Sequence, residues 1–314
     1  MKNKILTGLL LVLIGGWGSL SAQNVGSNYA RQVNTLIGTK GVGLTSGYLY
    51  PGATYPYGMV QFTPSYFSKR SGFVINQLSG GGCEHMGNFP TFPVKGKLKM
   101  SPDNILNYRI NISEEKGHAG YYEAKVQEDI HAKLTVTERT GMASYEYPAD
   151  QQYGTVIIGG GISATPIEQA AIVITAPNKC EGYAEGGNFC GLRTPYKVYF
   201  VAEFDTDALE SGTWKRDELK PNTTFAEGEY SGVYFTFDVN KKKNIQYKIG
   251  VSYVSVENAR ENLKAENTGW DFLQIQNQAE SKWNHYLGKI EVEGTNPDRT
   301  TQFYTHLYRS FIHP

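Results

Sequence analysis

The chain has 314 residues, enough for one large domain or two of ordinary size. Thirty basic and thirty acidic residues cancel, and no long run of one sign occurs. A neutral chain with scattered charge lacks the basic surface that a nucleic-acid-binding protein needs. The composition therefore excludes nucleic acid as a partner.

The first 22 residues have the pattern of a cleavable export signal. Lys2 and Lys4 give a positive start, residues 5–14 form a short apolar run, and Ala22 ends a small-residue cleavage site. An apolar run this short does not cross a membrane, which takes about 20 residues. A buried N-terminal helix is the alternative, but it does not explain the order of the three zones. The sequence predicts a secreted or periplasmic protein without a membrane span.

Residues 30–256 mostly show the period-two alternation of β-strands. Short runs rich in β-branched and aromatic residues are separated by Gly, Pro, Asn and Asp. Glycine makes up 35 of the 314 residues, above the average share of about 7%, which fits many tight turns. These features predict a mainly β fold, a large antiparallel β-sandwich of the supersandwich type. The expected strands are 125–126, 130–137, 143–147, 155–158, 171–174, 197–204, 233–239 and 245–254.

The pattern changes at Glu257, where apolar residues begin to follow at steps of three and four. This spacing predicts a helix within residues 257–287, and Gly288 is a suitable residue to end it. A short strand is expected at 289–292. Residues 257–295 are therefore interpreted as a helical linker after the sandwich.

A further helix is expected in residues 296–314, because Asn296 and Pro297 form a helix N-cap and first-turn pair. Its apolar stripe needs a partner to cover it, and the chain ends directly after the stripe. We therefore expect these residues to be the start of a helical domain that is missing, with the stripe left open. The stripe consists of Phe303, Leu307 and Phe311.

Three cysteines follow the export signal, and an oxidising compartment permits a disulfide. Cys180 and Cys190 are the expected pair, because the glycine-rich segment between them can fold back, and Cys83 would then be buried. Three buried thiols are the alternative. A zinc site is not expected, because the chain has no Cys-x-x-Cys motif and no closely spaced histidine pair.

A glycine-rich segment at residues 77–90 combines backbone amides with Glu84 and His85. It is not a phosphate loop, because no Gly-Lys-Ser/Thr follows. Cys83 with His85 could act as a thiol nucleophile and its base, but a buried structural cysteine is the favoured interpretation.

Several motifs in chain order resemble glycoside hydrolase family 92, the calcium-dependent exo-α-mannosidases. Residues 34–39 and 51–60 resemble the opening of that family, and residues 78–83 resemble its Leu-Ser-Gly-x-Gly-Cys segment. The resemblance extends over nearly all of the chain after the export signal. The later motifs are Gly120-Tyr121-Tyr122 and residues 134–139, 187–191, 259–263 and 303–308.

The resemblance implies a two-domain enzyme with a β-sandwich, a helical linker and an (α/α)6 barrel. Such enzymes hydrolyse terminal α-mannosides with inversion, using a glutamate as acid, an aspartate as base and Ca²⁺ on the mannose hydroxyls. Inversion needs carboxyl groups about 6.5–9.5 Å apart. In the family both carboxylates and most of the calcium site belong to the barrel. No catalytic residue or metal ligand is therefore assigned in this chain, and we expect it to be inactive alone.

The resemblance also implies that the sandwich contributes to the leaving-group side of the sugar cleft. The ligands would be α-mannose-containing glycans such as N-glycans or mannan, and the partner would be the missing barrel. A free-standing carbohydrate-binding module, or a structural module that assembles with a separately encoded barrel, remains the alternative. The expected sugar contacts are Tyr66, Gln77, Ser79, Gly80, Glu84, His85 and Asn88.

Overall fold

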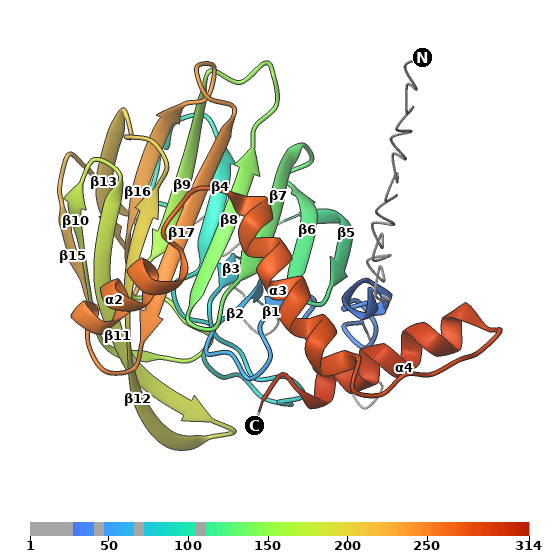
Figure 1. Ribbon diagram of the computed structural model, residues 1–314. Helices are drawn as coiled ribbons and strands as arrows, with labels where there is room; N and C mark the ends of the chain where they lie inside the picture. Colours follow the sequence, from blue (N-terminus) through green and yellow to red (C-terminus); the bar gives the residue numbers. More distant parts are fainter. Residues whose placement is uncertain (1–27, 41–46, 66–71, 104–110, 314) are drawn as a thin grey trace, which may run out of the picture.

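The computed structural model describes residues 28–40, 47–65, 72–103 and 111–313. The predicted export signal and Tyr66 lie outside these residues. Within them the chain forms two antiparallel sheets followed by three helices, so the predicted mainly β sandwich is confirmed (Figure 1). None of the described helices is long and apolar enough to cross a membrane.

The two sheets together contain every strand in the described part of the chain. The first has the order β1 (Ala53–Thr54), β2 (Gln61–Pro64), β3 (Phe73–Val74), β4 (Thr91–Lys95), β9 (Tyr153–Gly159), β16 (Ser231–Asp238), β13 (Glu210–Lys215) and β14 (Glu218–Pro221). The second has the order β15 (Phe225–Glu227), β10 (Ile167–Ala176), β11 (Lys179–Phe189), β12 (Leu192–Phe204), β17 (Asn244–Ser252), β8 (Thr140–Glu146), β7 (Ile130–Val136), β6 (Tyr121–Val126) and β5 (Ile112–His118).

The core lies between the sheets and is rich in aromatic residues. The ring of Phe204 on β12 packs against Phe235 and Phe237 of β16 and against Tyr247 of β17. All four side chains are buried. These contacts bind one sheet to the other, because β16 belongs to the first sheet and β12 and β17 to the second.

The predicted Cys180–Cys190 disulfide is wrong. The glycine-rich segment between these cysteines is not a loop but the eleven-residue strand β11. At about 3.3 Å per residue the two ends of such a strand are about 30 Å apart, whereas a disulfide needs Cα atoms within about 7 Å. Cys190 instead pairs with Cys83, at a Cα–Cα distance of 5.3 Å. Cys180 is a buried free thiol, so the alternative of three thiols is also wrong.

Two helices, not one, occupy the region of the predicted linker helix. They are α2 (Val256–Glu266) and α3 (Phe272–Leu287). The chain leaves α2 at Asn267, and the carboxylate of Asp271 caps α3 by accepting a hydrogen bond from the Gln274 amide. Gly288 ends α3 as predicted.

The predicted strand at residues 289–292 is not formed. The hydroxyl of Tyr304 donates to the Ile290 carbonyl and accepts from the Val292 amide, so this backbone bonds to a side chain and not to a sheet. Helix α4 (Pro297–Ser310) begins as predicted, with Asn296 as its cap and Pro297 in its first turn.

Helices α3 and α4 share a second, smaller core with the 3-10 helix η1 (Tyr29–Gln32). Trp283, Tyr304 and Tyr308 are fully buried there. The predicted open stripe of Phe303, Leu307 and Phe311 is half-buried against the same cluster. Helix α4 therefore packs on the sandwich chiefly through Tyr304 and Tyr308.

Charged groups also join α3 to the sandwich. The buried carboxylate of Glu280 accepts hydrogen bonds from Arg31 of η1, from His118 at the end of β5 and from Gln276. Burial raises the pKa of Glu280, but these hydrogen bonds outweigh that effect and lower the pKa to about 2. The carboxylate is therefore held in its charged form at the junction of three elements.

Candidate functional site

Residues 77–88, here called the rim loop, connect β3 to β4 at the end of the sandwich where α4 finishes. In Figure 1 the tip of the β11–β12 hairpin and the C-terminus lie together at this lower end of the molecule. The loop has no regular secondary structure. Its backbone takes positive φ at Gly80 and Gly87, which suits glycine, and also at Met86. Such a path persists only where surrounding contacts fix it.

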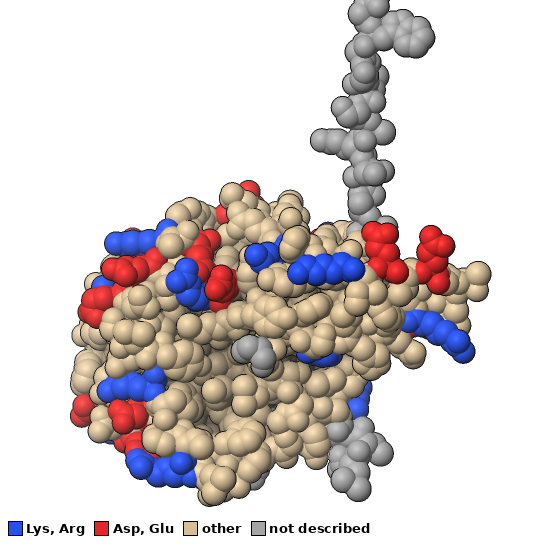
Figure 2. All heavy atoms as spheres, turned by 60° about the horizontal axis from the view of Figure 1, so that its bottom comes forward, with Lys and Arg blue, Asp and Glu red and all other residues tan. Residues whose placement is uncertain are grey.

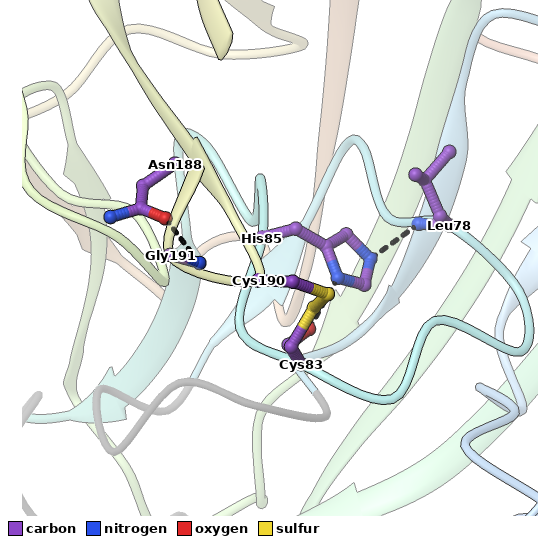
Figure 3. Close-up of a disulfide and its surroundings, with 6 residues drawn as sticks. All are labelled: Leu78, Cys83, His85, Asn188, Cys190 and Gly191. Atoms are coloured by element: carbon purple, nitrogen blue, oxygen red, sulfur yellow. Dashed lines mark hydrogen bonds between the residues drawn. A yellow bond between two sulfur atoms is a disulfide. The ribbon is translucent and has the colours of Figure 1, made fainter. Parts of the chain in front are cut away.

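The disulfide is the first of these contacts. It joins Cys83 of the rim loop to Cys190 at the tip of the β11–β12 hairpin (Figure 3). The side-chain oxygen of Asn188 accepts a hydrogen bond from the Gly191 amide, which closes the hairpin turn. Cys83 therefore has no thiol to act as a nucleophile and is a structural cysteine, but it is half-buried in a disulfide and not buried and unpaired as predicted.

His85 is the second contact. Its Nε2 accepts a hydrogen bond from the Leu78 amide at 2.8 Å, and its Nδ1 lies 2.7 Å from the Cys83 carbonyl (Figure 3). A carbonyl only accepts, so Nδ1 carries the proton and the ring is neutral. Burial lowers the pKa of His85, which favours this form. The imidazole therefore links the backbone of Leu78 to the backbone of Cys83 across the loop.

His313 is the third contact, and it comes from the segment after α4. Its Nε2 accepts a hydrogen bond from the Ser79 amide at 2.9 Å. The Phe311 carbonyl accepts from the Tyr57 amide, and Arg309 donates to the carbonyls of Tyr50 and Thr35. The end of α4 therefore binds the backbone of the sandwich loops directly.

Gln77 and Asn88 lie at the two ends of the rim loop and are buried. The backbone N–H of Gln77 donates to the side-chain oxygen of Gln61. The side-chain oxygen of Asn88 accepts from the Asn76 side chain and from the Tyr196 hydroxyl. These two residues and His85 were predicted to contact sugar, but each is directed into the protein. They hold the loop in place.

Ser79, Gly80 and Glu84 are the predicted contacts that reach the surface. Gly80 and Glu84 are exposed and Ser79 is half-buried. A side chain at Gly80 would find no heavy atom within 4 Å, so the space beside it is open. Glu84 lines a cavity of about 220 Å³ with Thr165, Glu229 and Tyr230. Of the six predicted contacts in the described residues, three are thus available to a ligand.

The end of the molecule that carries the rim loop has few charged side chains in its middle (Figure 2). Figure 2 looks onto this end and shows charged side chains toward its margins, with a mostly uncharged and hollowed middle. A neutral, hydroxyl-rich ligand suits such a surface better than a charged one does. No group of three or more His, Cys, Asp or Glu side chains in the described residues could hold a metal ion. The described residues therefore offer no cluster of carboxylates for the Ca²⁺ that the family resemblance implies.

Sequence comparison assigns the two parts of the chain. The model of the glycosyl hydrolase family 92 N-terminal domain matches residues 32–252, and that of the family 92 catalytic domain matches residues 258–314. The chain belongs to glycoside hydrolase family 92. The contact between Ser79 and His313 therefore joins the N-terminal-domain match to the catalytic-domain match.

Known family 92 proteins extend well beyond the region they share with this chain. An uncharacterized secreted glycosidase of Arthroderma benhamiae is 26% identical over 345 residues, covering 97% of this chain and 44% of that protein. The α-mannosidase BT3965 of Bacteroides thetaiotaomicron superposes with a TM-score of 0.79 at 24% identity, over 91% of this chain and 42% of that one. The inverting mannosidase BT2199 of the same organism gives 0.79 at 25%, over 91% and 40%. This chain thus spans less than half the length of these relatives.

Sequence reasoning missed two parts of the site. His313 was not singled out, because nothing in the sequence of a helix end shows which distant backbone it meets. The network behind Asn88 was also missed, in which Asn76 contacts the Tyr253 hydroxyl and the rings of Tyr196 and Tyr253 meet edge to face. The many aromatic residues in and next to β12 and β17 indicate core packing. They do not indicate that two of these residues lie behind the rim loop.

Proposed function

We propose that this chain forms the sandwich wall and the first barrel helix of an inverting α-mannosidase. In this proposal residues 30–256 are the sandwich, 257–295 the linker and 296–314 the start of the barrel. The catalytic carboxylates and the Ca²⁺ site belong to the barrel, so the 314-residue chain alone does not hydrolyse mannosides. The protein is exported through residues 1–22 and acts on α-mannose-containing glycans outside the cytoplasm.

One observation carries the proposal. The rim loop of the sandwich is hydrogen-bonded to His313, which follows α4 at the end of the residues that match the family 92 catalytic domain. Ser79, Gly80 and Glu84 therefore lie where the wall and the barrel meet. We assign them to the leaving-group side of the cleft, where a carboxylate and a backbone turn can bind sugar hydroxyls.

The proposal is tested in the protein joined to a family 92 catalytic barrel. Glu84→Gln removes a charged acceptor of sugar hydroxyls, a change worth roughly tenfold in affinity. We expect KM for a mannobiose to rise about tenfold, with kcat changed little. KM for an aryl α-mannoside should not change, because its leaving group is not a sugar.

Glu261→Gln is the matched control, since Glu261 is an exposed glutamate of α2 and lies outside the rim loop. It should leave both substrates unaffected. An unchanged KM for mannobiose in Glu84→Gln would remove Glu84 from the site. Tight binding of mannan by the 314-residue chain alone, measured by calorimetry, would favour a free-standing binding module instead.

A further inference from the structure

We propose that His85 and His313 are a pair of positioning residues that hold the rim loop by acting as uncharged acceptors, and that protonation of the pair releases the loop. The inference rests on the proposed function in one respect only. The position of the rim loop affects catalysis only because the loop is part of the wall of the sugar cleft.

The geometry of the pair requires neutral rings. His85 and His313 accept from two consecutive amides, those of Leu78 and Ser79, at 2.8 and 2.9 Å. A proton taken up from solvent binds Nε2, so an N–H then faces an N–H at the same distance. The hydrogen bond is lost, two donors are opposed, and the loop backbone has to move.

The two rings also act on each other. Burial lowers the pKa of His313, and the positive charge that His85 would carry lowers it further. Both rings are therefore neutral near pH 7 and become charged only in acid.

The titratable groups that the described residues place near the two rings come from the rim loop, the segment before it, the β11–β12 hairpin and α4. Within the loop, the neighbouring titratable group is Glu84, whose side chain is exposed. On the preceding segment, the Tyr48 ring would contact a side chain at Gly82, and the Tyr48 carbonyl accepts from Gly80. The hairpin contributes Phe189, whose ring lies 5.5 Å from that of His85, and the disulfide, which does not titrate.

On the α4 side the nearby charged group is Arg309, which already has hydrogen-bond partners. Arg309 directs its guanidinium at the carbonyls of Thr35 and Tyr50. Gly81 meets the His85 ring closely, since a Cβ there would lie 2.8 Å from its Cε1. The absence of a side chain at position 81 therefore leaves the space that the His85 ring occupies.

The test measures amide hydrogen exchange in the 314-residue chain by NMR at pH 7.5 and pH 5, with rates corrected for intrinsic exchange. We expect the protection of the Leu78 and Ser79 amides to fall about tenfold in acid, the effect of one lost hydrogen bond of ordinary net strength. Amides of β12 and β17 serve as the internal reference for global stability and should keep their protection.

Variants at His313 separate the proposal from general acid effects, because this residue follows the last helix and its replacement leaves the folded core intact. His313→Gln keeps an uncharged acceptor at a similar reach, so Ser79 should stay protected at both pH values. His313→Ala should lose that protection at both. His306→Ala, on the exposed side of α4, should behave as the unmodified chain.

Two results would overturn the inference. One is wild-type protection at Leu78 and Ser79 that does not change with pH. The other is protection in His313→Ala equal to that in His306→Ala. No sugar is present in this experiment, so its failure would leave the Glu84 prediction standing, and failure of the Glu84 prediction would leave these exchange results unchanged.

Discussion

Replacing Trp283 with alanine is expected to lower the free energy of unfolding by about 3–5 kcal/mol. The indole is fully buried between α3, α4 and the sandwich. Its N–H donates to the Thr54 carbonyl at 2.7 Å, and its ring lies 4.5 Å from that of Tyr308. Truncation therefore leaves a large cavity and a buried carbonyl that loses its donor.

Urea unfolding followed by circular dichroism measures this effect. Trp270→Ala is the matched control, because Trp270 is half-buried and its described contact is with the Lys248 ammonium. That change should cost about 1 kcal/mol or less. Equal destabilisation by the two substitutions would show that α3 is not anchored through Trp283.

Removing the Cys83–Cys190 disulfide by the double change Cys83→Ser and Cys190→Ser is expected to cost about 2–5 kcal/mol. The bond closes a loop with a sequence separation of 107 residues, so its loss frees a long segment of the unfolded chain. It also frees the rim loop from the β11–β12 hairpin. Proteolysis of the native protein should then become faster within residues 77–88.

Reducing agent should destabilise the unmodified protein by the same amount and leave the double variant unchanged. Cys180→Ala is the control, because Cys180 is a free buried thiol whose pKa is raised by burial. Cys180→Ala should lower the free energy of unfolding by less than the double change does. The variant should still be destabilised by the reducing agent. Loss of that sensitivity in Cys180→Ala would mean that Cys180 forms the disulfide.

The strands of the sandwich core were predictable because they are short runs rich in β-branched and aromatic residues. The runs at 130–137, 155–158 and 233–239 became β7, β9 and β16 with bounds shifted by only a few residues. Strand β7 alternates in burial along its first residues, whereas β9 and β16 are buried on both faces and are recognised as short apolar runs.

The strand β11 was not predictable in this way, and its omission caused the wrong disulfide. Gly182 and Gly186 were interpreted as loop residues. In the sheet they lie where the neighbouring strand β10 and the segment just before it approach closely, because a Cβ at Gly182 would lie 2.2 Å from the Ala171 carbonyl. The sequence does not distinguish a glycine that close packing requires from a glycine that a turn requires. Only the tertiary structure separates them.

The candidate site was predictable as a segment but not residue by residue. The glycine-rich pattern of 77–88 correctly indicated an irregular loop with closely approaching backbone. It did not show that His85 faces inward and Glu84 outward, because a loop has no fixed period that assigns side chains to faces. The contact with His313 joins residues 234 positions apart.

Hydrolysis of an aryl α-mannoside in the presence of calcium tests the central claim most directly. The purified 314-residue chain should give no rate above the uncatalysed background, and the same chain continued into a family 92 barrel should hydrolyse the substrate with inversion. Turnover by the 314-residue chain alone would contradict the assignment of this chain to the wall of the cleft, because the reacting carboxylates would then have to lie within it.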